Sequence, residues 1–166
     1  MTFGQMMLPE FDHEMASTRK TLERLPAGKF DFTPHPKSGT MAWTAAHIIQ
    51  MLHWGVMTCT TSSVDLADPA NQERPVQPKT AADAVAAFDK GVAALRPALE
   101  AVTDAQMSET WELKQGDKVF LSMPRAGVLR TVVFNHIIHH RAQLALYLRL
   151  NDVPVPALYG PSADES

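Results

Sequence analysis

The sequence predicts an all-α protein: a four-helix bundle, up-down-down-up in type, with a short β-hairpin before the last helix. Three observations lead to this fold class. Four long stretches place apolar residues three and four positions apart, two short strand-like segments flank a Gly-Asp pair, and a long polar stretch requires a crossover between the second and third helices. At 166 residues the chain is expected to be a single domain, residues 1–166.

The first helix is predicted by one apolar face and ends at Pro26-Ala27-Gly28. A proline-containing loop, residues 29–39, follows it, and the second helix is expected to begin after Thr40 as the N-cap. Residues 60–79 are polar and contain three prolines, so they are interpreted as a surface connection. The face of the first helix consists of Met7, Phe11, Met15, Thr18, Leu22 and Leu25.

The third helix is expected after Thr80, which forms a capping box with Asp83. Segments 109–113 and 118–123 flank Gln115-Gly116-Asp117 and predict the hairpin. The last helix is expected to begin near Pro124, to extend to about Leu150, and to be followed by an irregular tail. The face of the third helix consists of Val85, Phe88, Val92, Leu95, Leu99 and Val102.

Composition excludes several classes of function. The chain has 18 acidic and 15 basic residues, so its net charge of −3 argues against nucleic-acid binding. Its apolar runs are too short to cross a membrane, and the first residues do not resemble a signal peptide, so a cytoplasmic location is expected. A single cysteine, Cys59, excludes an intrachain disulfide and a thiolate-rich zinc site.

The seven histidines carry most of the functional information. His136 and His140 lie four residues apart on an otherwise apolar helix face, where two imidazoles can converge on one metal ion. Burying both imidazoles is costly unless each has a hydrogen-bond or metal partner. The second helix offers His47 or His53 as a third ligand, and spacing alone favours His47 only slightly. His139 is a rival partner for His136 and is interpreted as supporting or surface-exposed.

Three segments resemble the DinB-like superfamily, also called DinB/YfiT. Residues 135–149, NHIIHHRAQLALYLR, resemble the signature helix of that family, and residues 153–165, VPVPALYGPSADE, resemble the sequel found in one of its branches. Residues 30–41, FDFTPHPKSGTM, resemble the loop before its second helix. The resemblance covers essentially the whole chain, and its C-terminal third is the most specific part.

The resemblance implies a four-helix bundle that binds a divalent metal ion through three histidines. Carried over by position, the metal ligands are His47, His136 and His140, because residues 45–48, AAHI, resemble the family's LxxHI element. Three neutral ligands leave an open coordination position, as catalytic sites do. Zinc or nickel is expected first, and iron, manganese and copper are the alternatives.

The resemblance also implies a metal-dependent enzyme that acts on a small-molecule substrate, either a thiol S-transferase using a low-molecular-weight thiol or a hydrolase. Arg141 and Arg149 are candidates for binding the carboxylates of the thiol, or else form salt bridges. The candidate general bases are His139, Glu14, Asp12, Asp164 and Glu165. The alternative is a non-catalytic metal- or ligand-binding stress-response protein. A homodimer is expected, without nucleic-acid or membrane partners.

Overall fold

Four threonines begin four of the helices. The side chains of Thr2, Thr40, Thr80 and Thr103 accept hydrogen bonds from backbone N–H groups in the first turns, and three of them form capping boxes. Such caps stabilise a helix by about 1 kcal/mol each. The predicted N-cap at Thr40 and the predicted capping box between Thr80 and Asp83 are therefore confirmed.

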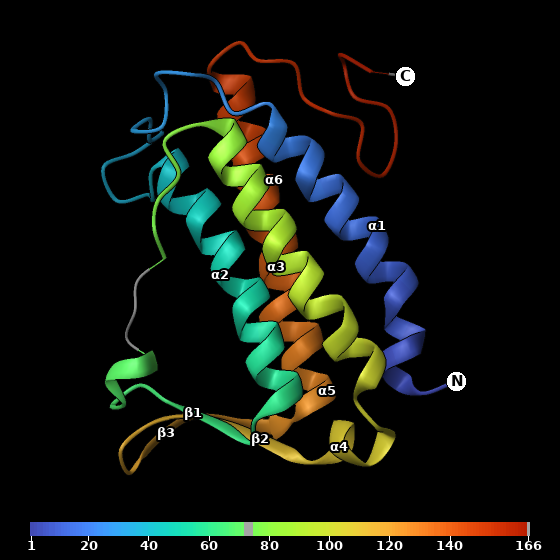
Figure 1. Cartoon of the computed structure of the whole chain (residues 1–166). Coiled ribbons are helices and arrows are strands. Elements are labelled where there is room, and N and C mark those ends of the chain that lie inside the picture. The colour runs from blue at the N-terminus through green and yellow to red at the C-terminus, as the bar shows by residue number, and fades with distance from the viewer. Residues whose placement is uncertain (72–74, 166) are drawn as a thin grey trace.

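The computed structural model describes residues 1–71 and 75–165. The expectation of a mostly helical chain is confirmed, and a small sheet accompanies the helices (Figure 1). The elements are α1 (Phe3–Glu23), α2 (Met41–Thr60), β1 (Ser63–Asp65), η1 (Pro69–Asn71), α3 (Ala81–Ala101), α4 (Asp104–Ser108), β2 (Thr110–Gln115), β3 (Lys118–Pro124), α5 (Arg125–Val128), η2 (Leu129–Phe134) and α6 (Asn135–Leu150).

The long helices share one hydrophobic core. Helix α3 packs against α1 and α2, while α6 packs against α2 and α1. In Figure 1, α2 and α3 run toward the end of the molecule that holds the sheet, and α1 and α6 run away from it. Gly55 and Gly91 allow α2 and α3 to pack closely, because a Cβ on Gly55 would collide with Leu95 and one on Gly91 with Leu52. None of the helices in the described part of the chain is long and apolar enough to span a membrane.

The sheet has one more strand than the sequence predicted. The predicted hairpin is present as β2 and β3, joined at Gly116, whose φ of +57° favours glycine. Strand β1 pairs parallel to β2 and gives the order β1-β2-β3. It lies within residues 60–79, which were interpreted only as a surface connection, and residues 72–74 of that stretch lie outside the described chain.

The last helical segment contains a wide turn that its sequence did not reveal. Helices α5 and α6 are joined by η2, a π-helical segment that ends one residue before α6 begins. A π turn bonds residue i to i+5, so it shifts the faces of the following helix relative to a regular α-helix. This shift precedes His136 directly, and π turns often occur beside functional sites.

The C-terminal tail folds back on itself and onto the helices. Ser162 Oγ donates to the Val155 carbonyl and accepts from the backbone N–H groups of Asp164 and Glu165. Asp164 pairs with Arg149 of α6, and Glu165 pairs with Arg24 just after α1. The tail is thus irregular, as expected, but it is fixed by specific polar contacts.

Candidate metal centre

Three histidines from two helices meet in the structure. His47 lies on α2, His136 and His140 lie on α6, and one ring nitrogen from each lies within 4.8 Å of the others. In the described part of the chain this is the one group of at least three His, Cys, Asp or Glu side chains close enough to share a metal ion. The rings of His136 and His140 stack with centroids 4.7 Å apart, as spacing by four on a helix predicts.

One pair of facing nitrogens has the spacing expected of two ligands to one metal ion. The Nε2 atoms of His47 and His136 are 3.3 Å apart. A tetrahedral zinc ion with bonds of about 2.0–2.1 Å sets two ligand nitrogens about 3.3 Å apart. His140 Nε2 is buried and has no hydrogen-bond partner; the other such buried side-chain atom in the described chain is Arg125 Nε. A buried nitrogen with an unused lone pair is costly unless a cation or proton occupies that position.

Two glutamines orient two of the three imidazoles. Gln50 Oε1 lies 3.1 Å from Nδ1 of His47, and Gln143 Oε1 lies 2.7 Å from Nδ1 of His140. Gln143 Nε2 contacts Nε2 of His139 at 3.2 Å, which fixes the orientation of its amide. Because an amide oxygen only accepts, each Nδ1 carries the proton and each Nε2 keeps its lone pair. This is the tautomer that binds metal through Nε2.

The surroundings of His136 and His140 favour their neutral forms. Burial is the main cause that lowers the pKa of His140 to about 4, and His47 lowers it further. Burial, followed by the neighbouring His47, also lowers the pKa of His136, although a hydrogen bond to the Val132 backbone opposes this. Metal binding requires neutral imidazole, so neither histidine needs to lose a proton near neutral pH.

A second polar cluster lies on a neighbouring face of α6. Arg141 is 1 % exposed, and its Nη1 lies 2.7 Å from the Glu14 carboxylate. The same Nη1 donates to the Glu14 carbonyl at 3.1 Å, and Nη2 donates to the hydroxyl of Tyr159. That hydroxyl donates to Glu14 at 2.9 Å, so the tail covers the ion pair. Desolvation, with the Glu14 carboxylate next in importance, raises the pKa of Tyr159.

The candidate arginines and carboxylates are already paired. Arg141 is bound to Glu14 and Arg149 to Asp164, so both take the salt-bridge role that the sequence left as an alternative. The other candidate bases have partners as well: Asp12 pairs with Arg96 and Glu165 with Arg24. His139 is the candidate base that adjoins the cluster, with its ring centroid 4.9 Å from that of His140.

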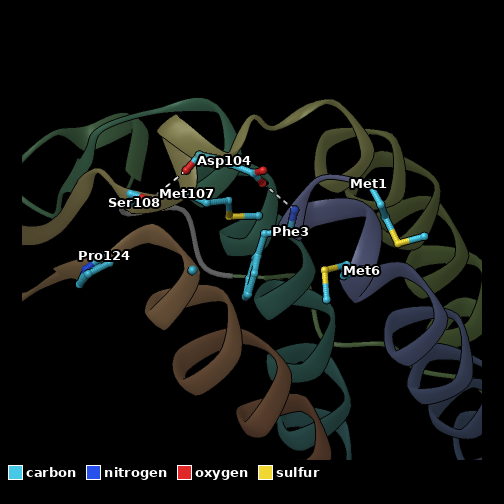
Figure 2. A pocket seen from close by; sticks show the side chains of 8 residues that line it. Met1, Phe3, Met6, Asp104, Met107, Ser108 and Pro124 are labelled. Atoms are coloured by element: carbon cyan, nitrogen blue, oxygen red, sulfur yellow. Dashed lines mark hydrogen bonds between the residues drawn. The ribbon is translucent and has the colours of Figure 1, made fainter.

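The cluster is accessible from the side of α2. A cavity of about 280 Å³ is lined by His47, Trp43 and Gln50, among others. A larger cavity, of about 570 Å³, lies at the end of the molecule near the N-terminus, and none of the three clustered histidines lines it. Figure 2 shows residues that line this larger cavity, among them Phe3, Met6 and Met107 of α4.

Trp43 and the two glutamines are site residues that the sequence analysis missed. Trp43 stacks on His47, with ring centroids 4.8 Å apart, and is 42 % exposed. Each glutamine follows a clustered histidine by three residues, in HIIQ (47–50) and HRAQ (140–143), a spacing that brings side chains together on a helix. That repeated His-x-x-Gln pattern was the available signal. His53 lies outside the cluster and is exposed.

The fold resembles solved structures of two bacterial proteins. A DinB-like protein from Bacillus cereus is 23% identical with a TM-score of 0.71, and the match covers 92% of this chain and 95% of that one. A DinB-like protein from Bacillus subtilis is 16% identical with a TM-score of 0.72, covering 95% and 99%. A comparison with curated proteins found no match. The sequence model of the DinB family matches residues 1–166, so this chain belongs to the DinB family.

Proposed function

We propose that this protein binds one divalent metal ion, zinc or nickel first, through the Nε2 atoms of His47, His136 and His140. The observation that carries the proposal is the buried, unpartnered Nε2 of His140 beside two further imidazoles. The same ion would relieve the close approach of Nε2 of His47 to Nε2 of His136, at 3.3 Å. Iron, manganese and copper remain alternatives, because three imidazoles accept several ions.

We further propose that the site acts on a small-molecule substrate, with residues 1–166 working as one domain. A divalent ion held by three neutral imidazoles acts as a Lewis acid that lowers the pKa of a bound water to about 7, or binds a thiolate. The residues of the chain orient the imidazoles through Gln50 and Gln143, and Trp43 covers one face of His47. The cavity beside His47 supports access for substrate.

Two reaction classes fit this site. A thiol S-transferase needs groups that hold the thiol cofactor. Arg141 is already paired with Glu14 and Arg149 with Asp164, so other groups would have to bind the carboxylates of the thiol. A hydrolase needs a base, and His139 is the candidate that adjoins the cluster. Thiol-dependent consumption of an electrophile such as 1-chloro-2,4-dinitrobenzene supports the transferase. Thiol-independent cleavage of p-nitrophenyl acetate supports the hydrolase, and both activities should disappear in His136→Ala.

The test of metal binding is elemental mass spectrometry of untagged protein. Wild type should contain near-stoichiometric metal after incubation with zinc, His136→Ala should not, and the control His53→Ala on α2 should match wild type. Little metal in the wild type, or equal loss in both variants, would overturn the proposal.

Whether the site is catalytic depends on an exchangeable coordination position. In cobalt-substituted protein, added cysteine or azide should change the visible absorption spectrum if the position is open. An unchanged spectrum would favour the alternative, a non-catalytic metal- or ligand-binding stress-response protein.

We also propose a homodimer with a cytoplasmic location. Leu146 and Leu150 support the dimer, because they lie one turn apart on α6 and are 55% and 53% exposed. Sedimentation equilibrium should give twice the chain mass, and Leu146→Lys should shift the protein toward monomer. A monomeric wild type would overturn this part of the proposal.

A further inference from the structure

Two cavities lie end to end along α2. The cavity of about 280 Å³ beside His47 and a second cavity of about 330 Å³ are both lined by Gln50 and Pro75. The second cavity continues along α2 past His53 and Trp54 to Met57. Small-molecule sites usually occupy about 300–1,000 Å³, so the joined pair reaches a size that the first cavity alone does not. We call the joined pair the α2 groove.

Most of the described side chains that line the α2 groove are apolar. Among the lining residues that the structure describes, which exclude residues 72–74, none is Asp, Glu, Lys or Arg. The far cavity is walled by apolar side chains, among them Ile49, Trp54 and Met57 of α2 and Ala87 of α3, with polar atoms supplied by Gln50, His53 and Asn71. A charged group placed there would lose its water and would find no ionic partner among the described lining residues, whereas an alkyl or aromatic group would gain from burial.

We propose that the α2 groove binds an uncharged alkyl or aromatic arm of the substrate whose reacting end meets the metal centre. This rests on the proposed function, because the near end of the groove is at His47. Helix geometry sets the length of the arm: the ten residues from His47 to Met57 rise about 15 Å. The substrate class is therefore an elongated molecule with a metal-binding group at one end and an alkyl or aromatic arm along the rest.

The test compares three hydroxamate probes on the zinc-loaded protein by calorimetry. Octanohydroxamate should bind at least about tenfold tighter than acetohydroxamate, because only its chain enters the groove. The half-hydroxamate of suberic acid has an arm of similar length with a terminal carboxylate, and it should lose most of that advantage. Equal affinity of octanohydroxamate and acetohydroxamate for the wild type would overturn the proposal.

Ala87→Trp blocks the far cavity without touching a candidate metal ligand. Its matched control is Ala86→Trp, since Ala86 is the exposed neighbour on α3 and lines neither cavity. The ratio of the affinity for octanohydroxamate to that for acetohydroxamate should fall to less than about threefold in Ala87→Trp and stay unchanged in Ala86→Trp. Equal behaviour of the two variants would overturn the proposal.

Failure of the metal site can be distinguished from failure of the groove. The metal content of each sample is measured, and the neutral dye Nile red is titrated against protein stripped of metal. Wild type and Ala86→Trp should bind the dye, and Ala87→Trp should bind it at least about tenfold more weakly. If the wild type binds no zinc, the proposed function fails, and this dye comparison alone decides whether the groove accepts apolar arms.

Discussion

Two polar clusters lie on neighbouring faces of α6 and differ in one respect. His140 belongs to the histidine cluster, which it forms with His136 and with His47 of α2. The next residue, Arg141, instead contacts Glu14 on α1 and Tyr159 in the tail. Every buried side-chain N and O atom of Arg141 and Glu14 has a partner, whereas Nε2 of His140 has none. Arg141 and His140 are both nearly inaccessible to solvent, at 1 % and 6 % exposed.

The difference in hydrogen bonding suggests different roles for the two clusters. A buried ion pair whose hydrogen bonds are complete holds elements together and has no capacity left for a ligand. A buried cluster with an unused lone pair is destabilising until something binds there, and this supports the proposed metal site. The cluster of Arg141, Glu14 and Tyr159 ties α1, α6 and the tail together at the residue next to His140. It therefore also holds in place the helix that carries two of the candidate metal ligands.

The largest expected effect comes from breaking the completed cluster. Arg141→Met leaves the Glu14 carboxylate buried without its partner, and the free energy of unfolding should fall by about 3–5 kcal/mol. Adding Glu14→Leu should restore most of this loss, because no uncompensated charge remains. Urea unfolding measures both. A loss below about 1 kcal/mol in Arg141→Met would contradict the assignment of a structural role.

A substitution in the histidine cluster should change stabilisation by zinc rather than the stability of the metal-free protein. Zinc at one hundred times its dissociation constant should stabilise the wild type by about 2.7 kcal/mol. His140→Leu should abolish this gain yet leave the metal-free protein as stable as wild type or more so, because it removes an unpartnered polar atom. Urea unfolding with and without zinc measures both effects. If His140→Leu destabilised the metal-free protein as much as Arg141→Met does, the contrast between the clusters would be wrong.

The contact between Gln143 and His140 should affect metal affinity. Gln143→Ala removes the acceptor that orients His140, and zinc affinity should fall about 10–100-fold. Gln143→Glu keeps an acceptor at the same position and should retain most of the affinity. Competition with a chromophoric chelator measures both. Unchanged affinity in Gln143→Ala would show that the contact does not orient the ligand.

The pH dependence of the metal-free protein tests the burial of His140. The folded-state pKa of His140 is lowered to about 4, below the ordinary value of about 6.5 expected in the unfolded chain. The unfolded state therefore binds the proton more readily, and stability should fall as the pH drops from about 6.5 toward 4. Urea midpoints across this range should fall less in His140→Leu. The same slope in both proteins would contradict burial of a neutral imidazole.

The sequence predicted much of the fold because its signals are local. Thr40, Thr80 and the Gly116 turn act within a few residues of themselves, and the structure has caps and a turn at those places. Strand β1 could not be predicted in this way, because three residues become a strand only when β2 lies beside them. The π turn before His136 was equally invisible, since an apolar pattern does not report which backbone hydrogen bonds form.

For the site, the sequence by itself determined that His136 and His140 share a helix face, because spacing by four does so in any α-helix. The choice between His47 and His53 was open from spacing, and only the packing of α2 on α6 brings His47 to the pair. Tertiary structure also decided that Arg141 is buried with Glu14 and that Arg149 is bound to the tail. Helix periodicity fixes which residues share a face, but contacts between elements fix which faces meet.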